Sequence, residues 1–199
     1  MRFPLTLQFK ILALAPQITV RDADGIELFY VHQKLFKLKE QIKVYRDSSK
    51  REPVYGIAAD RVLDFSAAYA FTEPSGRQIG AVKRRGMKSL WRAHYDVTDA
   101  TGRPALTIEE ENPAVKLLDG LLGEIPIVGM ATGYFLHPRY AVADATTGQP
   151  VLRVTKTRSL VEARFAVAAE PGAAPLGGEL ETAAVLAILT MALLERSRG

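Results

Sequence analysis

The sequence predicts a closed antiparallel β-barrel of about 12 strands that encloses a hydrophobic α-helix near the C-terminus. Three observations lead to this fold class. Short alternating apolar runs recur between Ile18 and Val167, and turns that contain an acidic residue and a glycine join many of them. The stretch from Leu180 to Leu194 is apolar on every side. The expected strands and this helix are also of similar length, so a wall of such strands can enclose the helix.

The strand pattern is clearest where two alternating runs flank an acidic residue and a glycine. Glycine supplies the positive φ of a tight turn, and the acid before it can hydrogen-bond the turn backbone. This pattern predicts hairpins at Ile18–Leu28, Tyr69–Ile79, Tyr95–Gly102 and Tyr140–Gly148. Further short strands are expected at Ile42–Arg46, Val54–Ile57, Ala105–Ile108, Val151–Val154 and Ala163–Val167. Many short strands at regular spacing are typical of a sandwich or a barrel.

The stretch from Leu180 to Leu194 is too short to cross a bilayer. At ~1.5 Å per residue it spans about 22 Å, whereas a membrane core of ~30 Å requires about 20 apolar residues. Its polar interior residues are Glu181, Thr182 and Thr190, which do not form the polar stripe of a surface helix. We therefore expect the helix to be enclosed by protein and expect no transmembrane segment in the chain.

Strand number follows from the dimensions of the helix. Strands of ~7 residues at ~3.4 Å each give a wall about 24 Å tall before tilt. Barrels of eight strands have room only for side chains, whereas 11-stranded barrels already hold a central helix. We expect one domain over residues 1–199, with a central helix at 180–196. A helix and loop insertion is expected at 112–136, where Asn112 and Pro113 resemble an N-cap and the first helical position.

Several segments together resemble the LURP-one-related family, which belongs with Tubby C-terminal domains and phospholipid scramblases in one superfamily. The resemblance covers nearly the whole chain. It is carried by residues 30–40 and 44–47, the acid-and-glycine hairpins, residues 83–92 and 133–140, and the terminal apolar helix. It implies a mainly β, Tubby C-terminal-like barrel of 12 antiparallel strands around a C-terminal helix. It also implies phospholipid binding, because Tubby-type domains bind phosphoinositides through basic surface residues. The cysteines that scramblase relatives carry for lipidation have no counterpart in this chain.

The most concentrated positive charge lies between Pro74 and Tyr95, where six basic residues occur without an acid. Each Lys or Arg near an anionic membrane contributes about 1 kcal/mol, and Trp91 could anchor at the interface. We predict that a site for anionic lipid or phosphate is formed by Lys83, Arg84, Arg85, Lys88 and Arg92. Two alternatives remain open. The segment could be a solvated hairpin whose charges pair with residues 109–111 while Trp91 packs on the barrel, or it could bind nucleic acid, although no known nucleic-acid motif is present.

The apolar segment 114–136 gives a second function class, a scaffold that binds a protein partner. Alternatively, this segment plugs the open end of the barrel. Catalytic motifs are lacking, since His32, His94 and His137 have no metal-type spacing and residues 22–27 lack the later ligands of a calcium loop. We therefore expect a non-enzymatic protein without cofactor or metal. The absence of cysteine fits a cytoplasmic location. From the basic segment we also expect peripheral association with the inner membrane face.

Overall fold

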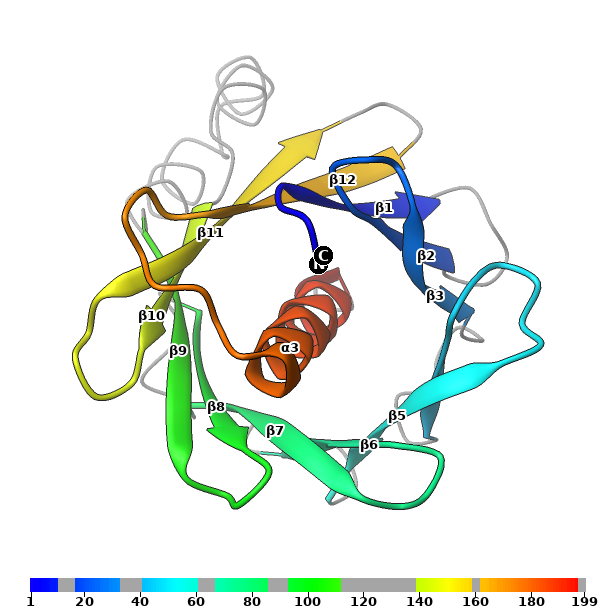
Figure 1. Cartoon of the computed structure of the whole chain (residues 1–199), viewed down its shortest axis with the longest axis horizontal. Coiled ribbons are helices and arrows are strands. Elements are labelled where there is room, and N and C mark those ends of the chain that lie inside the picture. Colours follow the sequence, from blue (N-terminus) through cyan, green and yellow to red (C-terminus); the bar gives the residue numbers. More distant parts are fainter. Residues whose placement is uncertain are drawn as a thin grey trace, which may run out of the picture.

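The computed structural model describes residues 1–10, 17–32, 41–60, 67–85, 93–111, 139–158 and 162–196. In these residues the chain forms a closed barrel of antiparallel strands around a helix, as predicted (Figure 1). The strands are β1 (Leu5–Lys10), β2 (Gln17–Arg21), β3 (Glu27–His32), β4 (Ile42–Tyr45), β5 (Pro53–Ala59), β6 (Ala68–Thr72), β7 (Gln78–Arg84), β8 (His94–Asp99), β9 (Pro104–Glu110), β10 (Arg139–Asp144), β11 (Pro150–Arg158) and β12 (Glu162–Ala169). The helix, labelled α3, spans Gly178–Arg196.

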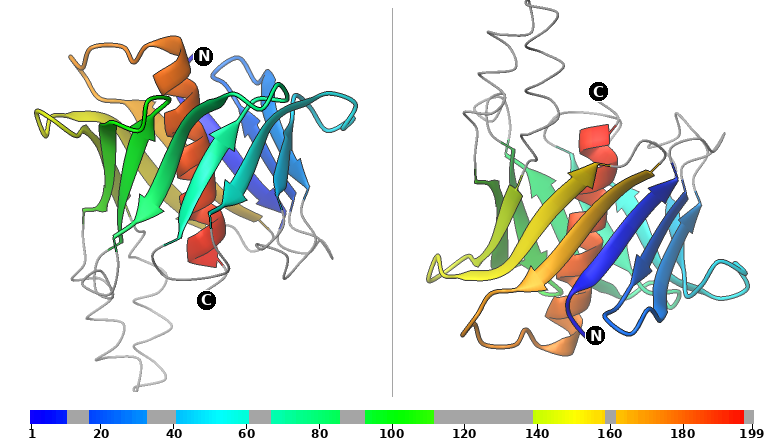
Figure 2. Two further views of the ribbon diagram at one scale, coloured as in Figure 1. Left: turned by 90° about the horizontal axis from the view of Figure 1, so that it is seen from below. Right: turned by 90° about the horizontal axis from the view of Figure 1, so that it is seen from above.

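Every strand pairs with its neighbours in sequence, and β1 closes the circle by pairing with β12. At this closure Leu5 lies opposite Val167 and Lys10 lies opposite Glu162. The helix runs through the barrel along its axis (Figure 2). We call the end at which α3 begins the hairpin end, and the end at which α3 finishes the helix-exit end. Within the described ranges, no helix is both long and apolar enough to cross a membrane.

The tight turns predicted from acid and glycine are all present at the hairpin end. In the turn after β8, Gly102 has a φ of 82° and its N–H donates to the carbonyl oxygen of Asp99 at 3.0 Å. The carboxylate of Asp99 also accepts hydrogen bonds from the backbone N–H groups of Thr101 and Arg103 at 2.8 and 3.0 Å. Hydrogen bonds from Thr101 and Arg103 hold the pKa of Asp99 below its usual value. The acidic residue therefore organises the turn from both its main chain and its side chain.

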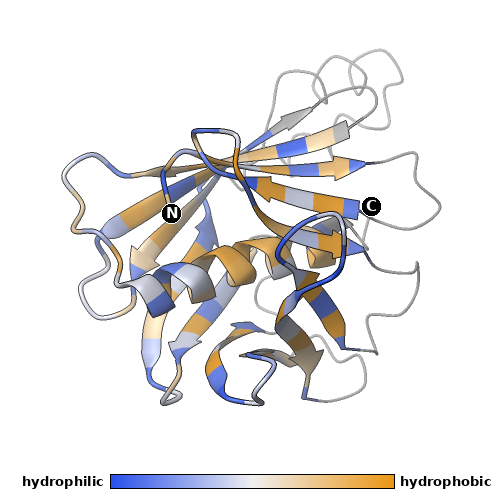
Figure 3. Ribbon diagram, turned by 45° about the vertical axis from the view of Figure 1, so that its right-hand side comes forward, coloured by the Kyte–Doolittle hydropathy of each residue, from blue (hydrophilic) through white to orange (hydrophobic). Residues whose placement is uncertain are grey.

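The core is the barrel interior, and α3 is its centre. Residues 183–193 of the helix are each no more than 6% exposed, and the apolar surface of the helix faces the strands in Figure 3. The two threonines of the helix are satisfied locally. The Thr182 hydroxyl donates to the carbonyl oxygen of Gly178 at 2.9 Å, and the Thr190 hydroxyl donates to that of Leu186 at 2.8 Å. An enclosed helix thus carries hydroxyl groups without an unpaired buried donor.

The helix packs against one side of the lumen, where it contacts β6, β7, β8 and β9. Gly80 of β7 permits the close approach. A Cβ at this position would lie 2.7 Å from the carbonyl oxygen of Thr98 and 3.2 Å from the Cβ of Ala183 on α3. Large side chains from the first and last strands also line the interior, including Phe9 and Phe165, whose rings meet edge to face at 5.5 Å. Protein side chains therefore fill the lumen on both sides of the helix.

Candidate functional site

The structure places the first three residues of the predicted basic site at the end of β7. Lys83 and Arg85 are exposed, but Arg84 is only 9% exposed and lies among the buried residues of the barrel. The reason is strand alternation, since Arg84 follows the buried Val82 by two residues and so shares its face. Lys88 and Arg92 of the predicted site, and Trp91, lie outside the described residues. Arg84 therefore does not share the exposed face of Lys83.

Arg85 is partly neutralised by an acid on the next strand. Its Nε atom lies 2.8 and 3.0 Å from the two carboxylate oxygens of Asp96, and these hydrogen bonds raise the pKa of Arg85. The acid that hydrogen-bonds Arg85 is thus Asp96, and Glu109, one of the residues named in the alternative prediction, also raises the pKa of Arg85. Lys83 lies opposite Asp96 in the register of β7 and β8. This pair of strands carries a mixed rather than a purely basic outer face.

Arg84 belongs to a layer of polar side chains inside the helix-exit end of the barrel. We call this set the inner polar layer, and its members are Arg84, Tyr95, Glu110, Tyr140 and Glu195. The four strand residues come from the neighbouring strands β7 to β10, and Glu195 comes from the last turn of α3. Strand alternation could have revealed the layer, because each strand residue stands two positions from a buried Val or Ile.

Contacts within the inner polar layer centre on Glu195. The Tyr95 hydroxyl donates to Oε1 of Glu195 at 2.8 Å, and Nη2 of Arg84 lies 3.9 Å from the same oxygen. The guanidinium of Arg84 also lies 5.8 Å from the centre of the Tyr95 ring. Burial and the nearby carboxylate of Glu195 raise the pKa of Tyr95, and burial with Glu195 and Glu110 raises that of Tyr140. The layer therefore holds the helix end in the barrel through neutral phenols and an ion pair.

His94 lies on the outside of the same strands between two carboxylates. Its Nδ1 lies 3.0 Å from Oε1 of Glu109, and its Nε2 lies 3.4 Å from Oδ1 of Asp96. Across the residues that the structure describes, no three His, Asp or Glu side chains form a group suited to a metal ion. The two carboxylates therefore place negative charge around His94, next to the guanidinium of Arg85.

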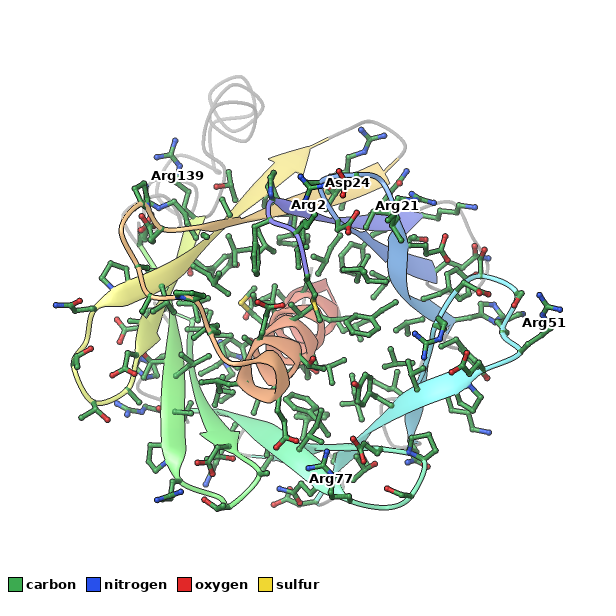
Figure 4. The ribbon with its side chains drawn as sticks, viewed as in Figure 1. Arg2, Arg21, Asp24, Arg51, Arg77 and Arg139 are labelled. Atoms are coloured by element: carbon green, nitrogen blue, oxygen red, sulfur yellow. The ribbon has the colours of Figure 1, made fainter. Side chains whose placement is uncertain are left out.

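Charge is distributed unevenly along the barrel axis. At the hairpin end, residues 1–4, 22–26, 46–52, 73–77, 99–103, 144–149 and 170–181 contain ten Asp or Glu and six Lys or Arg. The other described residues contain eight Asp or Glu and 12 Lys or Arg. Several acids of the hairpin end are engaged in turns or ion pairs. Asp24 pairs with Arg2 (Figure 4), and Glu179 pairs with Arg77. Exposed basic residues at strand termini of the helix-exit end are Lys10, Lys83 and Arg139, with Arg85 next to β7.

The insertion at 112–136, including the apolar segment proposed as a protein-binding scaffold, lies almost wholly outside the described residues, so that alternative stays a prediction. Comparisons of the chain with protein-family models, with curated proteins and with solved structures found no match.

Proposed function

We propose that this protein is a non-enzymatic Tubby-like barrel domain of the LURP-one-related type that docks on anionic phospholipid. The helix-exit end of the barrel makes the contact, and docking is reversible and peripheral on the cytoplasmic face. The observation that carries the proposal is the difference in charge between the segments of the hairpin end and the rest of the described barrel. The segments of the hairpin end have an excess of four acidic residues, and the other described residues have an excess of four basic residues.

Such a separation orients the molecule at a negatively charged surface. The acidic end is repelled and the basic end is attracted, and each Lys or Arg near the surface contributes about 1 kcal/mol. Lys83 and Arg85 are exposed contact residues in this proposal. Arg84 acts indirectly, because it is buried beside Glu195. Lys88 and Arg92 remain predicted contacts from their place in the sequence.

Co-sedimentation with vesicles tests the proposal. The test variant replaces Lys83, Arg85 and Arg139 with Gln, which removes three positive charges without adding an acid beside Asp96. The matched control replaces Lys50, Arg51 and Arg103 with Gln, which removes the same charge from the hairpin end. Arg84 is left in place, because its replacement would test folding rather than binding.

We expect the wild type to bind vesicles of phosphatidylserine and phosphatidylcholine but not vesicles of phosphatidylcholine alone. The test variant should bind about 100-fold more weakly, since three contributions of ~1 kcal/mol are lost, whereas the control should bind within about threefold of the wild type. Equal losses in both variants, or no binding by the wild type, would contradict the proposal. Inhibition by glycerol phosphate at constant ionic strength would instead identify a soluble phosphorylated ligand.

A further inference from the structure

A polar cavity of about 220 Å³ lies against the wall formed by β1, β2 and β3, far along the chain from the basic segment. Its lining residues are Gln8, Lys10, Gln17, Thr19, Arg21, Glu27, Tyr30 and Ser48. All of these carry hydrogen-bonding groups, and Ser48 comes from the turn between β4 and β5. At ~30 Å³ for each water, the cavity has room for about seven water molecules.

Neighbouring structure fixes the positions of the lining groups. The turn that bears Ser48 is closed by Arg46, which makes hydrogen bonds of 2.7 and 2.8 Å to the two carboxylate oxygens of Glu52. Nη1 of Arg21 donates to Oε1 of Gln8 at 3.1 Å across β1 and β2. These contacts hold the guanidinium and the turn in place before any ligand arrives, so the cavity is preorganised.

Arg21 and Glu27 place opposite charges side by side in the cavity. Nη2 of Arg21 lies 3.4 Å from Oε2 of Glu27, a long contact for a charged pair. The other carboxylate oxygen of Glu27, Oε1, is buried and has no hydrogen-bond partner among the residues that the structure describes. A buried carboxylate oxygen without a donor is unfavourable by about 1–3 kcal/mol. It marks the place where a ligand would supply a donor group.

The guanidinium of Arg21 supplies the complementary group. Its side chain is 41% exposed, and a planar guanidinium binds carboxylates through two parallel hydrogen bonds. Lys10 adds a second positive charge, so among the described lining residues two cations lie with one carboxylate, that of Glu27. Tyr30, which is 7% exposed, forms part of the wall, and burial together with Glu27 raises its pKa. The phenol therefore stays a neutral donor.

We propose that this cavity binds a small carboxylate that carries a hydrogen-bond donor on the adjacent carbon, that is, an α-amino or α-hydroxy acid. The ligand carboxylate lies on Arg21 and Lys10, and its ammonium or hydroxyl group donates to Oε1 of Glu27. The closeness of Arg21 to Glu27 selects ligands whose acceptor and donor lie on neighbouring atoms. The amides of Gln8 and Gln17 and the hydroxyls of Thr19 and Ser48 bind the remaining polar atoms.

Titration of the isotope-labelled protein, followed by the amide resonances of residues 17–32, tests this site with three probes. L-Serine carries the ammonium group, glycerate carries the hydroxyl group, and propionate carries neither. We expect serine or glycerate to cause saturable shifts at concentrations up to ~20 mM, and propionate to bind at least about tenfold more weakly. Preference for serine identifies an amino acid as the ligand, and preference for glycerate identifies a hydroxy acid.

Two conservative variants assign the roles. Arg21→Lys keeps the positive charge but loses the two parallel N–H donors of the guanidinium, and should weaken binding about tenfold. Glu27→Gln should weaken serine binding about tenfold and glycerate binding less. Arg103→Lys and Glu73→Gln make the same changes on turns outside the cavity and should bind as the wild type does. Absence of saturable shifts, equal binding of propionate, or unchanged affinity in both cavity variants would overturn the proposal. None of these results depends on whether the barrel binds vesicles.

Discussion

The hydroxyl of Tyr95 donates a 2.8 Å hydrogen bond to Oε1 of Glu195, which joins the start of β8 to the last turn of α3 inside the barrel. Arg84 approaches the same carboxylate from β7. A positive charge near the C-terminal end of a helix is also favourable for the helix dipole. This contact fixes how far the helix extends through the lumen, because the apolar part of α3 could otherwise slide against apolar strand residues.

Replacement of Tyr95 by Phe should therefore destabilise the protein. A hydrogen bond to a charged group contributes about 1.5–3 kcal/mol, and we expect a loss of this size in the free energy of unfolding. Urea denaturation provides the measurement. Tyr45→Phe, a change at a half-buried tyrosine of β4, is the control and should cost less than about 0.5 kcal/mol. A similar loss in both variants would show that Glu195 does not require the Tyr95 hydroxyl.

The raised pKa values of Tyr95 and Tyr140 predict a loss of stability in alkali. Unfolding returns each phenol to a pKa near 10.0, so above that pH the unfolded chain releases protons that the folded protein retains. The contribution of these two phenols to the free energy of unfolding should be constant below pH 10. Above pH 10 it should fall by up to ~1.4 kcal/mol per pH unit for each phenol. Urea denaturation between pH 8 and about 11 measures this slope. The slope should be smaller in Tyr95→Phe by the contribution of one phenol. An unchanged slope would contradict the assignment of part of the alkaline loss to Tyr95.

The close approach of α3 to β7 predicts that Gly80 cannot be enlarged without cost. Gly80→Ala places a Cβ 2.7 Å from the carbonyl oxygen of Thr98 and 3.2 Å from Ala183, so strand or helix must shift. We expect a loss of about 1–3 kcal/mol in the free energy of unfolding. A Cβ at Gly177 meets no atom within 4 Å, so Gly177→Ala is the control and should be near neutral. Retention of full stability by Gly80→Ala would show that the helix is not held against β7.

Enclosure of the helix is tested by Leu186→Asp, which places a charge at a position with no solvent exposure. A buried unpaired carboxylate costs several kcal/mol, so we expect the variant to lose cooperative folding. Circular dichroism and thermal denaturation report the result. The control is Ile26→Asp, at a turn residue that is 59% exposed, and it should keep its native transition. A native transition in the Leu186→Asp variant would exclude a filled lumen.

Much of the fold could be predicted because it depends on local signals. The turn at Asp99 and Gly102 is set by a carboxylate that binds the turn backbone and by a residue free to adopt positive φ. The length of the apolar stretch that ends at Leu194, compared with the expected height of the strands, was sufficient to indicate enclosure. These signals act within a few residues, so a sequence displays them directly.

The site was harder to predict because it depends on which face each residue takes. Arg84 was grouped with its basic neighbours, although its separation of two residues from Val82 places it inside. Its partner Glu195 could be identified only once the depth of α3 in the barrel was known. The cavity beside Arg21 depends on where the turn bearing Ser48 lies relative to β1, and no local pattern encodes that distance.

The closure between β1 and β12 governs when this protein can fold during its synthesis. Leu5 of β1 pairs with Val167 of β12, so β1 leaves the ribosome with one edge unpaired and keeps it unpaired until β12 has been made. The helix that fills the lumen emerges later still. A nascent chain therefore exposes both a strand edge and its future interior, the two features that promote aggregation. Completion of this barrel therefore follows the synthesis of β12 and α3, and its yield in the cell depends on how long the unfinished wall is kept apart from other copies of the chain.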